Sequence, residues 1–344
     1  AYEDWMESEG IPIVGGYAVD DLRTVPVEKW PRRGGSGAFI NLIGNENSAG
    51  SYVGEIPAGG SLEPQKHMYE ETMVILTGRG ATTVWYEGGP KQTFEWGEWS
   101  LFAIPLNCWY QHHNGQGDKP VRFYAVNSAP TIMNLFHNME FVFNTEFVFK
   151  DRYGAEEDYF SGKGKQWKAR GRPVWESNFI PDVLNVKLHE WKERGAGGAN
   201  IMFELANNTM AAHVSEFPSG TYKKAHRHGP AANVILLNGK GYSLLWREGE
   251  PWIKCDWHQG SVFTPPNQHF HQHFNVSKEP ARYLAIRWGS RKYLMGGERR
   301  SDTSVKSGGI QLEYEDESPE IRKLFVEELA KEGTELKMPP IIRK

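Results

Sequence analysis

Alternating histidines are the residues of this chain best suited to do chemistry. Five of the 12 histidines of the 344-residue sequence fall in two short stretches: His226, His228, His269, His271 and His273. Alternate residues of a β-strand point to one face, so each stretch presents its imidazoles on one side. If both stretches line one interior, that many buried imidazoles need a metal ion or a dense hydrogen-bond network. We expect a metal, because imidazole suits Fe, Zn, Cu and Ni.

The elements that carry these histidines occur twice. The segment "VEKWPRRGGSGAFINLIGNENSAGSYVGEIPAGG" (27–60) resembles "LHEWKERGAGGANIMFELANNTMAAHVSEFPSG" (188–220), and the offset of 161 positions continues without a gap through the following residues. Such self-similarity at a fixed offset predicts a tandem duplication of one domain. Matched pairs include Trp30 with Trp191, Arg33 with Arg194, Glu55 with Glu216, His67 with His228, Pro105 with Pro266, and Asn114 with Asn275.

Each copy contains short apolar runs separated by glycine and proline. "MVILTGRGATTVWYEG" and "NVILLNGKGYSLLWREGE" have the pattern of hairpins, and "SVFTPPNQHFHQHFN" that of a strand, a proline turn and a strand. Many short strands with such turns predict a sandwich or barrel. The one strong helical pattern covers 317–333, where Ser318 and Pro319 signal the start and Gly333 the end.

The two histidine stretches resemble the motifs of the cupin superfamily. The first cupin motif is similar to the arrangement of Gly220, His226 and His228 ahead of Gly239. The second motif is similar to Gly260, Pro266, His271 and Asn275. The resemblance covers both halves and so implies a bicupin. The expected fold class is all-β, with tandem double-stranded β-helix (jelly-roll) barrels and a C-terminal helix. The predicted parts are an N-terminal cupin with a degenerate metal site (1–136), a linker (137–178), a C-terminal cupin with the metal site (179–295) and a tail with the helix (296–344).

The resemblance also implies the metal ligands. The first cupin motif supplies two His and a Glu, and the second motif supplies one His. In the C-terminal copy Ala232 stands at the Glu position, which leaves a three-His set as the metal ligands and the catalytic centre: His226, His228 and His271. We expect His269 and His273 to be hydrogen-bond partners behind the ligands; the alternative is that one of them is a fourth ligand.

The N-terminal copy departs further from the motif. Gln65 and Tyr110 stand where two of the histidines are expected, and His112 matches His273. A weak metal site made of His67, Glu71 and His112 is one interpretation. The favoured interpretation is a degenerate barrel that stabilises its partner.

Four further residues are candidates for the walls of the site. Trp246 follows the hairpin after the first motif, and Arg287 lies in the strand after the second. Arg287 would clamp a substrate carboxylate or form a surface ion pair. Glu216 would orient a ligand histidine or, because Glu55 matches it, play a structural role. His213 is a lone histidine on a predicted strand.

Within the superfamily, "AHRHGPAANVILLNG" is similar to the gentisate and salicylate 1,2-dioxygenase group. Those bicupins imply Fe(II), O₂ and cleavage of an aromatic ring that bears hydroxyl and carboxylate, although their metal is held by the N-terminal cupin. We therefore expect a mononuclear non-haem Fe(II) dioxygenase that cleaves a C–C bond of a small hydroxylated aromatic acid or diketone-like substrate. Zn, Mn, Ni or Cu are alternative metals. The alternative functions are a metal-dependent non-oxidative enzyme (isomerase, lyase or decarboxylase) and a non-catalytic ligand-binding bicupin.

Composition limits the classes of partner that we expect this protein to bind. The net charge of −4 gives no basic surface for nucleic acid or anionic membrane, and no apolar run is long enough to span a bilayer. Cys108 and Cys255 are the only cysteines, which favours a reducing cytoplasm. We expect a cytoplasmic homo-oligomer whose partners are a small-molecule substrate and O₂.

Overall fold

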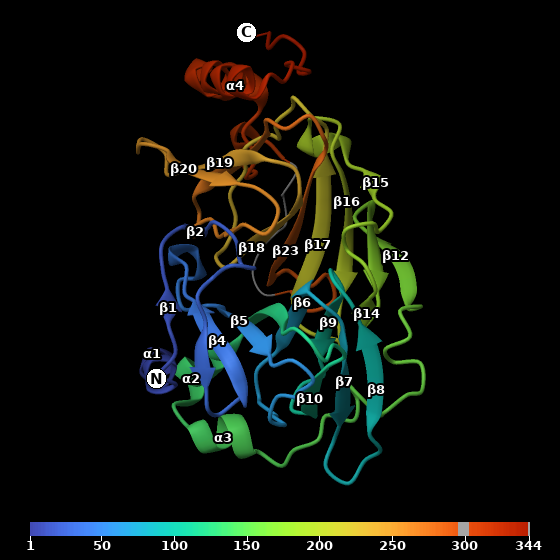
Figure 1. Ribbon diagram of the computed structural model, residues 1–344. Helices are drawn as coiled ribbons and strands as arrows, with labels where there is room; N and C mark the ends of the chain where they lie inside the picture. Colours follow the sequence, from blue (N-terminus) through green and yellow to red (C-terminus); the bar gives the residue numbers. More distant parts are fainter. Residues whose placement is uncertain (295–302, 343–344) are drawn as a thin grey trace.

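Two β-barrels stand one above the other in the computed structural model, which describes residues 1–294 and 303–342 (Figure 1). Residues 296–302 of the predicted tail lie outside the described part. The all-β, tandem jelly-roll prediction is confirmed, as is the C-terminal helix. Each barrel consists of a larger sheet that faces a smaller, three-stranded sheet. None of the helices in the described ranges is both long and apolar enough to cross a membrane.

The N-terminal barrel has an eight-stranded larger sheet. Its strands run in the order β1 (Ile13–Val14), β4 (Gly35–Ile40), β5 (Gly50–Ile56), β11 (Val121–Asn127), β6 (Glu71–Thr77), β9 (Leu101–Ile104) and β14 (Phe179–Ile180), and β3 (Glu28–Trp30) pairs with β4. The smaller sheet has the order β10 (Trp109–Asn114), β7 (Gly80–Trp85) and β8 (Gln92–Trp96). Three helices lie beside this barrel: α1 (Tyr2–Ser8), α2 (Ala129–Phe136) and α3 (Met139–Asn144).

The C-terminal barrel repeats this arrangement. Its nine-stranded sheet runs β12 (Lys165–Ala169), β13 (Arg172–Glu176), β16 (Ala199–Glu204), β17 (Met210–Phe217), β23 (Ala281–Trp288), β18 (Asn233–Asn238), β21 (Val262–Phe263) and β2 (Ala18–Val19), and β15 (His189–Glu190) pairs with β16. The smaller sheet is β20 (Ile253–Trp257), β19 (Gly241–Trp246) and β22 (Phe270–Asn275). The order β16-β17-β23-β18-β21 repeats β4-β5-β11-β6-β9, as a duplication requires.

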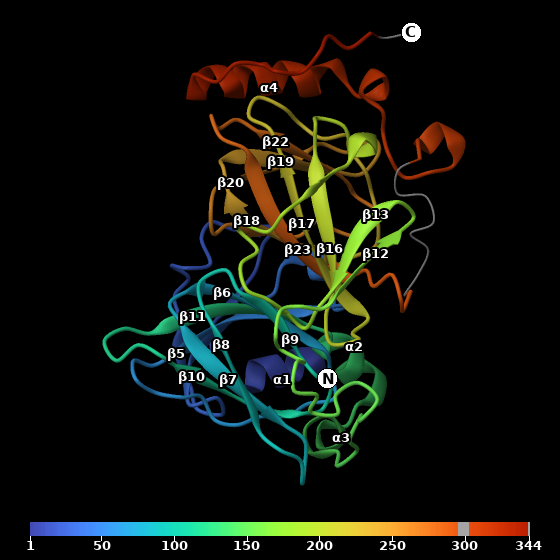
Figure 2. The same cartoon turned by 90° about the vertical axis from the view of Figure 1, so that its right-hand side faces the viewer.

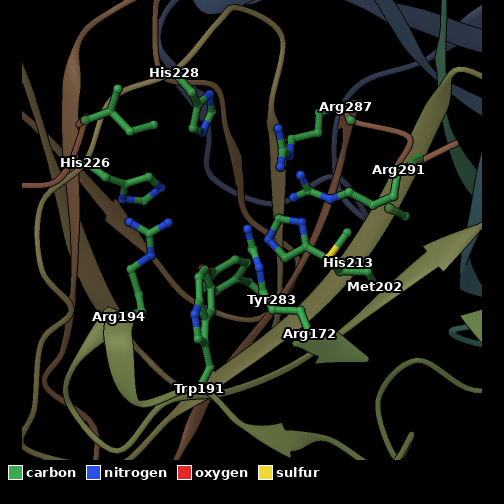
Figure 3. A pocket seen from close by; sticks show the side chains of 14 residues that line it. Arg172, Trp191, Arg194, Met202, His213, His226, His228, Tyr283, Arg287 and Arg291 are labelled. Carbon is green, nitrogen blue, oxygen red and sulfur yellow. The ribbon is translucent and has the colours of Figure 1, made fainter. Parts of the chain in front are cut away.

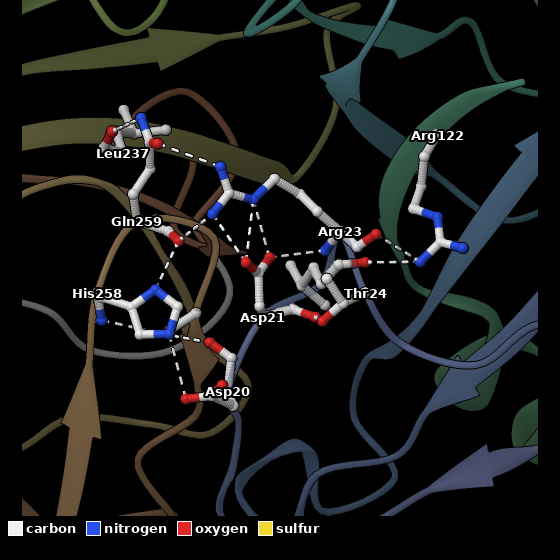
Figure 4. Close-up of polar contacts among 10 residues, drawn as sticks. Asp20, Asp21, Arg23, Thr24, Arg122, Leu237, His258 and Gln259 are labelled. Atoms are coloured by element: carbon white, nitrogen blue, oxygen red, sulfur yellow. Dashed lines mark hydrogen bonds and ion pairs between the residues drawn. The ribbon is translucent and has the colours of Figure 1, made fainter. Parts of the chain in front are cut away.

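Short segments tie the two barrels together. Strand β2 lies between β1 and β3 of the N-terminal barrel in the chain but pairs with β21 of the other barrel, and β14 pairs with β9 of the N-terminal barrel. Next to β2, Arg23 forms an ion pair with Asp21 at 2.8 Å and donates to the carbonyl of Gln259 at 2.7 Å (Figure 4). Arg122 in turn donates to the carbonyl of Arg23 at 2.9 Å. A single apolar core runs through both larger sheets, so the barrels are packed as one body.

The segment between the copies adds a hairpin to the second barrel. Strands β12 and β13 pair antiparallel, and β13 then pairs in parallel with β16, with Val174 opposite Met202. Figure 2 shows this hairpin at the edge of the C-terminal sheet. The parallel register places Arg172, at the start of β13, beside the interior of that barrel.

Helix α4 (Pro319–Glu332) covers the outside of the smaller C-terminal sheet. Ser318 caps its start by accepting from the amide of Glu320, and Gly333 ends it with φ 62°, as the sequence predicts. Phe325 packs on Tyr222 and Phe274 with ring centroids 5.1 and 5.6 Å apart. The four short 3₁₀ turns of the described residues are η1 (Ile43–Asn45), η2 (Lys192–Arg194), η3 (Val305–Ser307) and η4 (Tyr314–Asp316).

A buried amide at the contact between the barrels provides a test of this packing. Asn233 accepts from the Tyr124 hydroxyl at 2.9 Å and donates to Asn45 Oδ1 at 3.1 Å. We expect Asn233→Ala to lower the free energy of unfolding by about 1–3 kcal/mol, because buried partners lose their hydrogen bonds. Urea denaturation measures the change. Asn238→Ala, at the same strand's half-buried end, removes only bonds within the C-terminal barrel and should have a smaller effect; equal effects would contradict the inter-barrel role.

Candidate metal centre

The structure brings the three predicted ligands together. His226 and His228 lie in the extended segment before β18, and His271 lies in β22. One nitrogen from each ring lies within 4.8 Å of the others. In the part of the chain that the structure describes, this is the one group of three or more metal-ligating side chains that meet so closely.

A backbone bridge sets the approach of two of these rings. The amide of His226 donates to the carbonyl of His271 at 3.1 Å, and the amide of His271 donates back at 2.9 Å. This pairing holds the two Nε2 atoms 3.1 Å apart. On the other side of the segment, residues 310–312 of the tail form further backbone bonds with 225 and 227. The histidine segment is therefore fixed from both sides.

Hydrogen bonds select which nitrogen of each ring faces the centre. His228 Nδ1 lies 2.8 Å from the carbonyl of Gly229, and His271 Nδ1 lies 3.2 Å from that of His269. Carbonyl oxygen only accepts, so each Nδ1 carries the proton and each Nε2 keeps its lone pair. His226 Nδ1 is buried without a hydrogen-bond partner among the described residues. The donor arrangement fits a cation placed between the three Nε2 atoms.

Electrostatics keep two of these rings, His226 and His271, neutral. Burial, followed by the positive charge of Arg194 and the neighbouring imidazoles, lowers the pKa of His226 well below its usual value. Burial and neighbouring histidines do the same to the pKa of His271. A metal ligand must be deprotonated to offer its lone pair. The three-His set is therefore suited to a divalent first-row metal, whose bonds to imidazole nitrogen are about 2.0–2.1 Å long in the case of Zn²⁺.

His269 and His273 lie outside the three-His group. The Nδ1 atom of His273 lies 2.9 Å from Ser243 Oγ, which also accepts from Trp257 Nε1 at 3.0 Å. The ring centroid of His273 is 5.7 Å from that of His271. His269 contacts the centre through its backbone carbonyl, which accepts from His271, while its own Nδ1 lies 3.2 Å from the carbonyl of Asn267.

In the N-terminal barrel a closed polar network occupies the corresponding place. The carboxylate of Glu71 accepts from the Tyr52 hydroxyl at 3.1 Å, the Tyr110 hydroxyl at 3.0 Å and Asn127 Nδ2 at 3.0 Å. Burial opposes ionisation of Glu71, but contact with His67 and Asn127 and the charge of Arg33 lower its pKa to about 2.

The weak N-terminal metal site gains no support from this arrangement. His67 Nε2 lies 3.6 Å from Glu71, but the carboxylate is already bonded to three other side chains. His112 lies apart, with Nδ1 2.8 Å from Thr82 Oγ1. This is the same contact that His273 makes with Ser243, so it belongs to the scaffold of both barrels.

A small cavity opens beside His226 and His228 (Figure 3). About 40 Å³ of it is open to the centres of water-sized molecules. Four arginines from three segments of the chain line it: Arg172, Arg194, and Arg287 with Arg291. The guanidinium carbons of Arg172 and Arg194 each lie 4.6 Å from the ring centroid of Trp191. The walls also include Met202, His213 and Tyr283.

The other predicted wall residues have different positions. Arg287 lines the cavity, and its role as a substrate clamp stays a prediction. Trp246 points away from it, because its ring stacks on Phe270 at 5.6 Å in the core beneath α4. Glu216 forms a 2.8 Å ion pair with Arg282, which donates to the carbonyl of Leu184. Glu55 and Arg122 form the same pair in the first barrel, so Glu216 belongs to the shared scaffold.

Several cavity residues were missed by the sequence interpretation. Arg194 carried a signal, because Arg33 matches it in the duplication. Arg172, Arg291 and Tyr283 carried none that local spacing could provide. Arg172 and Tyr283 reach the cavity through strand pairing between segments that are distant in the sequence, and Arg291 follows β23 with its amide bonded to Glu204.

Comparisons with known proteins identify the fold. No family model and no curated protein matches the sequence. Solved structures of the Bacillus subtilis oxalate decarboxylase, which one study describes through its Mn(II) centres, are similar with 15% identity, a TM-score of 0.52, and coverage of 80% of this chain and 78% of that one. The Lactobacillus farciminis oxalate decarboxylase in complex with formate shares 14% identity at a TM-score of 0.52, covering 79% and 86%.

This likeness shows that the chain shares its two-barrel fold with the oxalate decarboxylases. The shared architecture extends over about four-fifths of the chain. The likeness to gentisate and salicylate dioxygenases and the choice of Fe(II) are not confirmed by these structures.

Loss of one ligand gives a direct test of the centre. We expect His271→Ala to abolish the bound metal, because two imidazoles remain where three converge. Metal analysis of the purified variant by mass spectrometry measures the loss. His112→Ala, in the corresponding sheet of the first barrel, is the matched control and should retain the metal of the unmodified protein. Equal metal content in both variants would place the metal elsewhere.

Proposed function

We propose that the protein is a metal-dependent bicupin enzyme that cleaves a small carboxylate, as a decarboxylase or lyase, without net consumption of O₂. The observation that carries the proposal is that both barrels have an arginine at the same position, whereas only the first barrel has the neighbouring carboxylate. Arg33 and Arg194 occupy matching positions, whereas Glu71 is matched by Ala232. A divalent first-row metal on His226, His228 and His271 is part of the proposal.

In the first barrel the arginine is balanced within the protein. Arg33 is only 3% exposed and its guanidinium lies 5.5 Å from the Trp30 ring centroid. It donates to the Tyr110 hydroxyl at 3.1 Å, and that hydroxyl donates to Glu71. One buried positive charge thus faces one buried negative charge.

In the second barrel the same arginine faces the three histidines. Arg194 is 4% exposed, lies over Trp191 and donates to the neutral Gln311 at 3.2 Å. In Figure 3 its guanidinium points toward the His226 ring. A divalent metal on neutral imidazoles would add two positive charges nearby. Positive charge on a metal held by three neutral ligands costs several kcal/mol unless an anion compensates it, so the site favours a ligand that brings an anionic group.

The size and the other walls of the cavity restrict this anion. Arg172, Arg287 and Arg291 add positive charge around the same space. A cavity that binds benzene in an engineered protein measures about 150 Å³, whereas about 40 Å³ is open here. An aromatic acid therefore fits this space poorly, and a carboxylate of a few heavy atoms fits it well. Guanidinium groups bind carboxylates in a bidentate fashion.

The arrangement supports charge stabilisation during bond cleavage. A bound divalent metal would act as a Lewis acid on a substrate oxygen. Arg194 would hold the carboxylate at the histidine side, and Arg287 and Arg291 would hold the opposite end. Arg194 and His271 are 4% and 3% exposed, and this burial strengthens their interactions with a bound anion or metal. Both solved neighbours are oxalate decarboxylases, which makes oxalate the first substrate to try.

A dioxygenase is the second candidate. Three neutral ligands leave open positions on a metal, and these can bind a chelating substrate together with O₂. With Fe(II) this arrangement is typical of oxygen activation. The small cavity and the decarboxylase neighbours favour the non-oxidative reaction.

Turnover assays separate these functions. We expect the metal-loaded protein to release CO₂ from oxalate or another small keto or dicarboxylic acid, with no O₂ uptake at an oxygen electrode. The reason is that the cavity suits a small anion, and the cleavage of such an acid to CO₂ does not consume O₂. Stoichiometric O₂ uptake with a hydroxylated aromatic acid or a diketone would establish the dioxygenase instead. Tight binding of acids without turnover would establish a binding protein.

Restoring the missing carboxylate tests the electrostatic argument. Ala232→Glu should preserve or tighten metal binding and lower kcat/KM for the small acid by at least about tenfold, because the new carboxylate replaces the anionic group of the substrate. Ala232→Gln is the matched control, with nearly the same volume and no charge. If both variants lose activity equally, filled space and not charge is responsible, and the anion argument fails.

A further inference from the structure

A buried lysine and a tyrosine lie side by side at the wall of the candidate site. Lys223 is 1% exposed, and its ammonium group donates to Ser215 Oγ at 2.6 Å and to the Tyr283 hydroxyl oxygen at 3.3 Å. The Nζ atom also lies 4.8 Å from the Tyr283 ring centroid and 5.1 Å from that of Phe217. Burying an ammonium group is unfavourable unless it is well compensated, so its presence here requires an explanation.

The first barrel shows what the scaffold needs at these positions. Lys223 is matched by Leu62, and Ser215 by Gly54. Tyr283 pairs with Ser215 between β23 and β17, as Phe123 pairs with Gly54 between β11 and β5. The ring of Phe123 lies 5.3 Å from His112, and that of Tyr283 lies 5.2 Å from His273.

The first barrel, which has the closed polar network around Glu71, therefore has an apolar pair here, Leu62 and Phe123. The ionisable pair occurs in the barrel that has the three-His group. Since the scaffold is the same in both, packing alone does not explain Lys223 and Tyr283. We therefore consider Lys223 and Tyr283 as functional groups of the candidate site.

Tyr283 connects this pair to the cavity. It lines the same space as His226 and His228, and Figure 3 shows its ring among the wall side chains. The charged or titratable groups around it are Lys223 on the segment before β18, Arg194 on η2, His213 and Glu216 on β17, and His273 on β22. The cationic neighbours stabilise a phenolate.

The pKa directions agree with the geometry. Burial opposes ionisation of Tyr283, but the Lys223 ammonium, with hydrogen bonds from Ser215 and Lys223, outweighs it and lowers the pKa of the phenol. Burial lowers the pKa of Lys223. A phenol whose oxygen accepts from an ammonium group can give up its own proton readily.

We propose that Tyr283 is the proton donor of the reaction and that Lys223 is the positioning residue that stabilises the resulting phenolate. This inference rests on the proposed cleavage of a small carboxylate. The bond between the carboxylate and its neighbouring carbon breaks, CO₂ leaves, and the electron pair of that bond stays on the carbon. The phenol proton of Tyr283 joins that carbon. Water then returns a proton to the phenolate and leaves hydroxide.

Two substitutions test this assignment. Tyr283→Phe, which places the residue of the first barrel at this position, should retain metal content and KM while kcat falls by about 10²–10⁴-fold. Lys223→Met should raise the pH at which kcat declines on the alkaline side, because the proton donor then ionises at higher pH. Tyr242→Phe is the matched control: its buried hydroxyl has no hydrogen-bond partner among the described residues, lies in the core beneath α4, and its loss should leave kcat unchanged.

A titration that needs no substrate provides the second readout. The near-ultraviolet absorbance of tyrosinate should show one tyrosine that ionises at lower pH than the others. This step should vanish in Tyr283→Phe and move to higher pH in Lys223→Met. An unchanged titration in Tyr283→Phe would overturn the proposal, as would full kcat with an unchanged pH profile in that variant. Absence of CO₂ release by the unmodified protein would instead overturn the proposed function.

Discussion

The placement of buried positive charge is the constraint on which the rest of this protein depends. Each barrel holds an arginine on the face of a tryptophan, Arg33 on Trp30 and Arg194 on Trp191. A guanidinium group is always protonated in proteins, so each barrel must provide or recruit negative charge. The first barrel provides it through Glu71. In the second barrel Ala232 stands at the matching position, and the three-His group would add positive charge when a divalent cation binds.

The duplication separates architecture from chemistry. Features present in both barrels support the fold: the Glu55–Arg122 and Glu216–Arg282 ion pairs, and the hydroxyl contacts of His112 and His273. Features present in one barrel point to a reaction. In the second barrel, histidines replace Gln65 and Tyr110, and an ionisable pair replaces Leu62 and Phe123. Because the scaffold is held constant, each difference is informative about function in a way that a single domain would not be.

The same comparison explains why the substrate interpretation moves from an aromatic ring to a small anion. The three-His set alone is compatible with oxygen chemistry as well as with Lewis-acid chemistry. What distinguishes them is the surrounding wall, where Arg172, Arg194, Arg287 and Arg291 converge on a small space. Trp246, predicted as an aromatic wall, packs beneath α4 and does not line this cavity.

The sequence by itself determined the duplication, the two jelly-roll barrels, the capped C-terminal helix and the convergence of His226, His228 and His271. The duplication, the strand-rich pattern and the helix follow from periodicity, turn residues and a fixed offset, whereas the jelly-roll fold and the three ligands follow from the resemblance to the cupin motifs. Only the tertiary structure decided which other side chains reach the site. Arg172 arrives through the parallel pairing of β13 with β16, and Tyr283 meets Lys223 through the pairing of β23 with β17. Such pairings depend on strand register between distant segments, which local pattern does not encode.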